Sequence, residues 1–173
     1  VSNTANLFAQ AASAGRGKLS DTELQSLLAD LQIGFADRAV LAGAADIRIS
    51  LNSTREFGMV ISAGLGGLEA ELGEGNFRRD RASVYAAAEL TDAEDFLGLF
   101  RRTLAYQKLV AVARRNGSQP PDVPLKACFE RLLELTKAFA PGKADAPCVL
   151  RSLELNPAQV GEDVMVRATQ RLQ

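Results

Sequence analysis

Hydrophobic residues in the first forty positions follow the 3.6-residue period of an amphipathic helix. Ser2 can cap a first helix that ends at Gly15. Ser20 and Glu23 form a capping box ahead of a second helix, in which each satisfies a backbone donor of the other. A stripe of leucines continues to Gly34, which predicts the end of that helix. The pattern therefore predicts a helical amino-terminal segment.

From residue 45 the hydrophobic period changes to two. Ile47, Ile49 and Leu51 alternate with polar residues, which is typical of a half-buried strand. A polar turn then leads into a second apolar run, 57–63, so the two runs predict an antiparallel hairpin. A further strand is predicted near Asn76 and Phe77.

The carboxy-terminal half returns to helices and closes with strands. Thr91 to Glu94 resemble a second capping box, and the helix they start is predicted to continue to Leu104. Another helix is predicted over 123–139, followed by strands over 149–155 and 164–168. Helices and strands are segregated along the chain, which predicts an α+β fold. We expect a helical segment over 1–39 and one α+β domain over 40–173.

The amino-acid composition excludes several classes of function, mainly because one residue type, histidine, is absent. The 173 residues contain no histidine, which excludes histidine-dependent catalysis, histidine-ligated metals and a phosphohistidine within this chain. The 20 basic and 21 acidic residues leave a net charge of −1, which argues against a nucleic-acid-binding surface. No apolar run approaches the ~20 residues that span a bilayer. The two cysteines, Cys128 and Cys148, are predicted to be reduced in a cytoplasmic protein.

Two short motifs could carry chemistry. Gly64, Gly66 and Gly67 lie after a predicted strand, where glycines allow a backbone to approach a ligand or cradle a phosphate. Glu154 and Asn156 lie two residues apart in a strand and share one face, and their oxygens suit Mg²⁺. Each motif also fits an ordinary structural explanation, namely a tight turn and a solvated strand end.

Together these motifs resemble the ATP-grasp domain of NDP-forming acyl-CoA synthetases, which are related to the succinyl-CoA synthetase β chain. Residues 57–61, followed by Gly64-Leu65-Gly66-Gly67 and by Glu71, are similar to the family's Phe-Gly, Gly-Leu-Gly-Gly and Glu stretch. Residues 154–157 match its Glu/Asp-x-Asn-Pro motif. The order and approximate spacing agree from about residue 40 to residue 168.

The resemblance implies the carboxy-terminal lobe of an ATP-grasp domain, which binds ATP and Mg²⁺ to activate a carboxylate for thioester formation with CoA. Matching by position gives two metal-binding residues, Asn156 and Glu71. It also gives a set of nucleotide- and phosphate-binding residues: Asp46, Gly64, Gly66, Gly67 and Arg167. The amino-terminal lobe and the CoA-binding, His-bearing domains are expected in other parts of a parent protein. The first residue, Val1, suggests a piece of a longer or processed chain.

Arg167 departs from the family, which has a metal-binding Asp at this position. A guanidinium cannot ligate Mg²⁺, although it can hold a phosphate or pair with a nearby glutamate. We therefore expect weak or absent Mg²⁺ binding, and no ligase activity from this chain alone. The alternative is a degenerate ATP-grasp-like module that has lost its metal site and acts in assembly or regulation. The acyl substrate, the choice of ATP or GTP, and the oligomeric state stay open.

Overall fold

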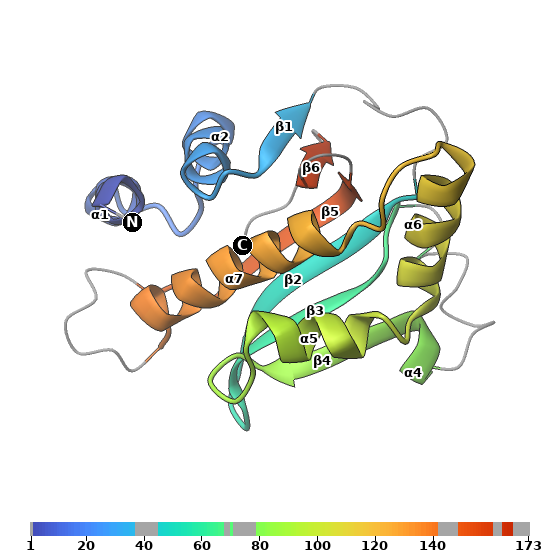
Figure 1. Ribbon diagram of the computed structural model, residues 1–173. Coiled ribbons are helices and arrows are strands. Elements are labelled where there is room, and N and C mark those ends of the chain that lie inside the picture. The colour runs from blue at the N-terminus through green and yellow to red at the C-terminus, as the bar shows by residue number, and fades with distance from the viewer. Residues whose placement is uncertain are drawn as a thin grey trace.

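Six strands form a sheet in the part of the chain that this computed structural model describes, namely residues 2–36, 45–67, 70, 79–141, 149–160 and 164–167. They are β1 (Gly34–Ala36), β2 (Ile47–Thr54), β3 (Gly58–Leu65), β4 (Ser83–Ala87), β5 (Ser152–Val160) and β6 (Val164–Arg167). Their order across the sheet is β1-β6-β5-β2-β3-β4, as Figure 1 shows. All neighbours are antiparallel except β1 and β6, which pair in parallel.

The described helices are α1 (Ser2–Ser13), α2 (Asp21–Asp30), α4 (Arg79–Ala82), α5 (Ala93–Phe100), α6 (Leu104–Arg115) and α7 (Asp122–Phe139). In Figure 1, α5 and α7 lie over one face of the sheet, and α1 and α2 lie beside the β1 edge. The predicted α+β class is confirmed. No helix in the described ranges combines the length and apolarity needed to cross a bilayer.

The central strands separate a buried face from a polar one. Ile47, Ile49 and Leu51 of β2 are fully buried beneath the helices. The intervening residue Ser50 lies on the other side, where it pairs with Ser62 of β3 and Glu154 of β5. The Oγ atoms of Ser50 and Ser62 are 2.7 Å apart. We call this side, which carries Arg48, Ser50, Ser62 and Glu154, the polar face.

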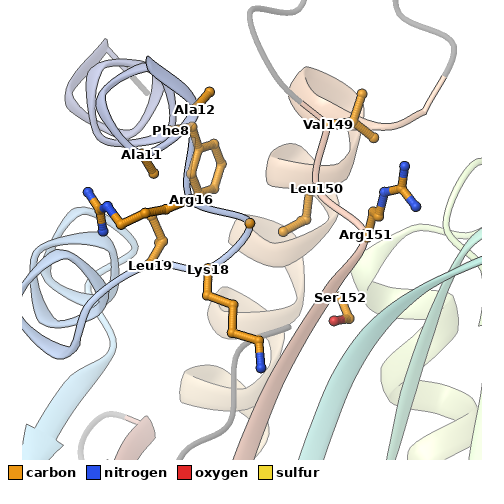
Figure 2. Close-up of a pocket in the computed structure, with 11 residues that line it drawn as sticks. Phe8, Ala11, Ala12, Arg16, Lys18, Leu19, Val149, Leu150, Arg151 and Ser152 are labelled. Atoms are coloured by element: carbon orange, nitrogen blue, oxygen red, sulfur yellow. The ribbon is translucent and has the colours of Figure 1, made fainter. Parts of the chain in front are cut away.

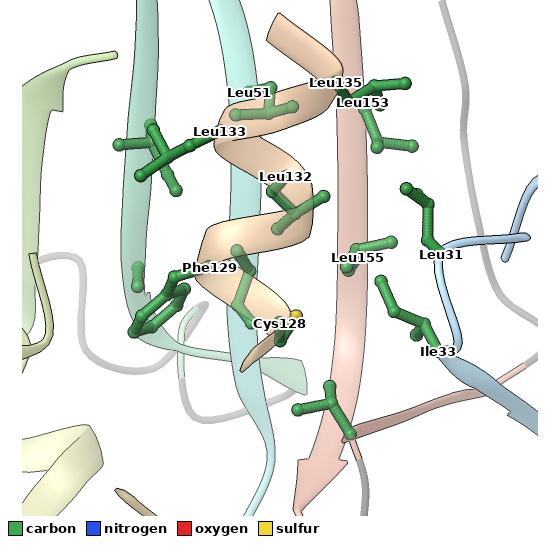
Figure 3. Close-up of a cluster of buried hydrophobic side chains, with 14 of the residues drawn as sticks. Leu31, Ile33, Leu51, Cys128, Phe129, Leu132, Leu133, Leu135, Leu153 and Leu155 are labelled. Atoms are coloured by element: carbon green, nitrogen blue, oxygen red, sulfur yellow. The ribbon is translucent and has the colours of Figure 1, made fainter. Parts of the chain in front are cut away.

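The helix α7 supplies much of the core. Figure 3 shows its Phe129, Leu132 and Leu133 beside the leucines of β2 and β5. Residues of the amino-terminal helices belong to the same buried cluster. Phe8 of α1 makes an edge-to-face contact with Phe139 of α7, with the ring centroids 4.9 Å apart. Such burial stabilises the fold by about 1.5–3 kcal/mol per large apolar side chain. The domain boundary between residues 39 and 40 stays a prediction.

The second helix ends earlier than predicted. It stops at Asp30, and the chain turns at Gln32, which has a φ of 51°. The N–H groups of Gln32 and Ile33 donate to the carbonyls of Ala29 and Leu28, which satisfies the helix end. The prediction that Gly34 ends this helix is therefore wrong. Gly34 is the first residue of β1. Because β1 has only three residues, its alternation of polar and apolar positions is too short to be recognised in the sequence.

The helix predicted from Thr91 to Leu104 is two helices. The residue that caps α5 is Asp92, whose side chain accepts a hydrogen bond from the N–H of Asp95; Thr91 is not the cap. Thr103 then caps α6 by accepting a hydrogen bond from the N–H of Tyr106. The apolar period continued across this break, so the pattern alone could not reveal it.

Two further predictions concern a third strand after the β2–β3 hairpin and the state of the two cysteines. The strand near Asn76 and Phe77 lies outside the described residues, and the strand that does pair with β3 is β4. Cys128 is a free, fully buried thiol, and burial raises its pKa to about 12. Cys148 lies outside the described residues, so its state stays a prediction.

The capping box at α2 predicts a pH dependence. The Arg16 guanidinium binds Glu23 through two hydrogen bonds of 2.7 Å, and the N–H and hydroxyl of Ser20 also donate to Glu23. Together they lower the pKa of Glu23 from 4.5 to about 2. A lowered pKa stabilises the folded state above pH ~4.5, and this contribution disappears as the pH falls towards about 2.

We therefore expect Glu23→Gln to flatten the pH dependence of the melting temperature over this interval. The effect should be small because Arg16 is 41% exposed to solvent. The matched control is Glu56→Gln in the exposed β2–β3 turn, where no described side chain binds the carboxylate. An unchanged acid dependence in Glu23→Gln would contradict the assignment.

Candidate functional site

The two predicted motifs meet in the structure. The chain after β3 passes β5, where the N–H of Gly67 donates to Oδ1 of Asn156 at 2.9 Å. The other side of the same amide, Nδ2 of Asn156, donates to Oε1 of Glu154 at 3.2 Å. The predicted proximity of Glu154 and Asn156 is therefore observed. Segments 89 residues apart in the sequence are thus joined at one end of the polar face.

Asp46 completes this cluster from the start of β2. Its carbonyl accepts a hydrogen bond from the N–H of Gly66 at 3.0 Å, and its Oδ1 accepts one from Nε2 of Gln159 at 2.9 Å. Gly67 has a φ of +57°, and a Cβ there would lie 2.7 Å from Oδ2 of Asp46. A side chain at position 67 would therefore be strained and would collide with the carboxylate.

These contacts change the role expected of the glycines. A phosphate cradle needs free backbone N–H groups. The N–H groups of Gly66 and Gly67 are already donated to Asp46 and Asn156. A Cβ on Gly66 would collide with the backbone of Ile47. The glycines therefore allow close packing of the chain against β2 and β5.

The structure places only some of the predicted site residues. Five of them gather where the start of β2 and the end of β3 meet the middle of β5: Asp46, Gly64, Gly66, Gly67 and Asn156. Arg167 is the last residue of β6, opposite Ala36 of β1, and its side chain lies outside the described part. Glu71 also lies outside the described residues. The binding roles of all these residues stay predictions.

Arg48 is a residue that the sequence analysis missed. It lies on the polar face, opposite Gly64 of β3, and is only partly exposed. No described side chain forms an ion pair with it. A half-buried cation without a partner is unfavourable unless a ligand or water compensates it. In the sequence, Arg48 looks like any polar residue of an alternating strand, so only the structure singles it out.

Gln159 was missed for a similar reason. Its side chain is 4% exposed, and its Oε1 has no hydrogen-bond partner in the described part of the chain, while its Nε2 holds Asp46. A buried amide oxygen normally has a partner. Among the described residues, Oε1 of Gln159 is therefore an unused acceptor beside Asp46.

The described residues do not form a complete site for a resident Mg²⁺. The oxygens of this cluster that could bind a metal are Oδ1 of Asn156, which already accepts from Gly67, and the carboxylates of Glu154 and Asp46, which accept from Asn156 and Gln159. No group of three acidic, histidine or cysteine side chains suited to a metal occurs within the described ranges. Mg²⁺ prefers several oxygens in octahedral geometry, with substrate phosphates often supplying part of the set.

No protein-family model and no curated protein sequence matches this chain. Solved structures do match it. A chain of the dinucleotide-forming acetyl-coenzyme A synthetase 1 of Ca. Korarchaeum cryptofilum, in complex with coenzyme A and Mg-AMPPCP, superimposes with a TM-score of 0.68 and 15% identity. The alignment covers 95% of this chain and 96% of that one. This chain has the fold of that synthetase chain.

The other similar structures agree. The apo form of the same synthetase gives a TM-score of 0.69, again with 15% identity and the same coverage. A protein from Pyrococcus horikoshii matches with a TM-score of 0.52 and 20% identity, over 73% of this chain and 47% of that one. The predicted resemblance to acyl-CoA synthetases is thus confirmed for the fold. It also extends beyond residues 40–168, where the sequence motifs lie.

Proposed function

We propose that this chain is the nucleotide-binding carboxy-terminal lobe of an NDP-forming acyl-CoA synthetase. The observation that carries the proposal is the hydrogen bond from Gly67 to Asn156, which joins two motifs of that family beside a polar sheet face. The fold shared with an acetyl-CoA synthetase chain supports it. The activity itself needs its own test, because a fold can host unrelated functions.

In this proposal the polar face binds the phosphates of ATP, and Arg48 supplies positive charge to them. An arginine can hold a phosphate through two parallel hydrogen bonds. Arg48 suits this role because it is half-buried and no described carboxylate neutralises it. Arg167 would add a second cation from β6. The glycines and Asp46 hold the start of β2 and the end of β3 against the middle of β5.

The same proposal assigns Mg²⁺ a minor role in this chain. Asn156 would offer one ligand oxygen and Glu71 a carboxylate, while Arg167 would oppose the cation. Two positive unit charges that lie ~4 Å apart repel each other by about 4 kcal/mol at an effective dielectric constant of about 20. The amino-terminal lobe, the CoA-binding domain and the relay histidine would come from elsewhere in a parent protein. They would complete carboxylate activation and thioester formation.

A degenerate module without catalysis is the second candidate. The observation that favours it is the lack of a three-ligand metal group among the described residues. Such a module would keep the fold and act in assembly or regulation. The two candidates differ in whether ATP binds the polar face, because only the first requires it.

The test is titration of the ¹⁵N-labelled chain with ATP, with and without Mg²⁺, followed by NMR. We expect ATP to shift the amide signals of Arg48, Ser50 and Ser62, with little added effect of Mg²⁺. Arg48→Gln should weaken ATP binding about tenfold, the factor for one charge-assisted hydrogen bond. The matched control is Arg55→Gln, which removes the same charge from the exposed β2–β3 turn.

Three results would count against the proposal. Absence of any ATP-dependent shift on the polar face would favour the degenerate module. Equal loss of affinity in Arg48→Gln and Arg55→Gln would mean that binding is non-specific. Tight binding that depends strictly on Mg²⁺ would contradict the weak-metal assignment.

A further inference from the structure

The strand β4 forms an edge of the sheet, and no described strand pairs with its outer side. Edge strands of soluble proteins are normally protected by charged side chains, by proline or by a bulge. Residues 82–88 contain no charge and no proline, and β4 pairs with β3 in one continuous register. The opposite edge strand, β1, has only three residues. The longer, unprotected edge is therefore that of β4.

The register of β4 with β3 shows which backbone groups point away from the sheet. The N–H of Ala88 donates to the carbonyl of Met59 at 2.7 Å, so these two residues form a hydrogen-bonded pair. Hydrogen-bonded and non-hydrogen-bonded pairs alternate along an antiparallel ladder, so Val84 and Ala86 also bond to β3. The intervening residues direct their N–H and C=O groups outward: Ser83, Tyr85 and Ala87.

Two copies of this strand complement each other in one antiparallel register. With Tyr85 opposite Tyr85 of the second copy, Ser83 of each strand lies opposite Ala87 of the other. Every outward-pointing backbone group of both strands then has a partner. A shift by two residues in either direction would leave one such residue of each strand unpaired. The favoured register has a two-fold axis at Tyr85, which is the symmetry of an isologous dimer.

The same register brings opposite charges together just beyond the strand ends. Arg81 precedes β4 and Glu89 follows it, at equal distances from Tyr85 in the sequence. Both side chains are exposed, and neither forms an ion pair with a described side chain. Because the two positions are symmetric about Tyr85, Arg81 of each copy comes towards Glu89 of the other.

Apolar surface on both sides of the strand adds to this edge. Ala86, Leu90 and Leu99 line a hollow between β4 and α5, and Leu90 is 87% exposed. In the paired arrangement, Val84 of the second copy lies opposite Ala86 at this hollow. Tyr85 lies on the polar face opposite Ser62 and is 64% exposed, so the two Tyr85 rings would lie side by side.

We propose that two copies of this chain associate through their β4 strands, which joins their sheets into one continuous antiparallel sheet. A second copy is the occupant of this edge because the backbone groups and the flanking charges of β4 are complementary to themselves about Tyr85. A strand of five residues is short for a standard interface of about 1,600 Å², so we expect a weak dimer that depends on concentration. The inference does not depend on nucleotide binding.

The test begins with sedimentation velocity of the full chain over about a hundredfold range of concentration, in which we expect a shift from monomer to dimer. Hydrogen–deuterium exchange followed by NMR then locates the interface. The amides of Ser83, Tyr85 and Ala87 should exchange more slowly at the highest concentration than at the lowest. Those of Val84 and Ala86, which bond to β3, should be protected at both.

Charge reversals test the register. Arg81→Glu and Glu89→Arg should each weaken the dimer about tenfold, because each replaces an attraction by a repulsion at two symmetric positions. An equal mixture of the two variants should dimerise again, since opposite charges then meet at both ends. Arg151→Glu is the matched control. Arg151 is an exposed arginine just before β5, at a cavity lined by α1 (Figure 2), and β2 and β3 separate β5 from β4.

A proline variant tests the backbone pairing. Ala87→Pro removes an N–H that points outward and is not used within the chain. It should weaken the dimer at least tenfold, because two hydrogen bonds are lost by symmetry, and it should change the melting temperature of the monomer little.

Three results would overturn the proposal. A chain that stays monomeric at every concentration would leave the β4 edge without a second copy. A dimer in which the amides of Tyr85 and Ala87 gain no protection would use another surface. A mixture of Arg81→Glu and Glu89→Arg that associates no better than either variant alone would exclude the register centred on Tyr85.

Discussion

Replacing Phe129 by alanine should lower the free energy of unfolding by about 3–5 kcal/mol, the range for a buried aromatic side chain. Phe129 is fully buried in α7. Its ring makes edge-to-face contacts with Phe96 and Phe100. The ring centroids are 4.9 Å apart in the first pair and 5.8 Å apart in the second. The variant therefore leaves a cavity and loses two aromatic contacts between α7 and α5. Urea denaturation followed by circular dichroism measures the loss.

The matched control is Phe57→Ala in the β2–β3 turn, where the ring is 67% exposed. We expect this change to alter the free energy of unfolding by less than about 0.5 kcal/mol. If Phe129→Ala and Phe57→Ala destabilised the chain equally, the position assigned to α7 over the sheet would be wrong.

Gly66→Ala should be the most damaging small substitution near the candidate site. An added Cβ would collide with backbone atoms of Ile47, and backbone cannot move aside as a flexible side chain can. Overpacking of this kind destabilises by about 1–3 kcal/mol or more. The shift of the chain should also break the hydrogen bond from Gly67 to Asn156, which would change the NMR signal of the Asn156 side-chain amide.

Gly98→Ala provides the opposite control. Gly98 lies inside α5, and a Cβ there meets no atom within 4 Å. Because alanine favours a helix over glycine by up to about 1 kcal/mol, this variant should be slightly more stable than the parent chain. A neutral Gly66→Ala beside a stabilised Gly98→Ala would refute the close approach of the glycine segment to β2.

The parts of the fold that could be predicted are those with long or locally capped patterns. The capping box of Ser20 and Glu23 starts α2 as predicted, and the alternation from Ile47 produces the β2–β3 hairpin. In contrast, β1 has three residues, and β4 has five residues at an edge of the sheet. Their strand conformation depends on pairing with β6 and β3, which the local sequence does not specify.

The candidate site shows the same division. Asn156 and the glycines could be found by their motifs, but the hydrogen bond that joins them spans 89 positions and depends on the sheet order. The partners of the Gly66 and Gly67 N–H groups could not be foreseen, because a glycine-rich turn and a phosphate cradle look alike in sequence. Arg48 becomes noticeable only once the polar face and its neighbours are known.

The parallel pairing of β1 with β6 has a consequence for how the chain folds during its synthesis. The hairpin of β2 and β3 and the helices that follow can associate as soon as they leave the ribosome, because their contacts lie within the central part of the chain. Gly34 must wait for Met165, so β1 finds its partner only once β6 has also been synthesised. Until then the β5–β6 edge of the sheet does not exist, and the amino-terminal helices have only part of their final packing surface.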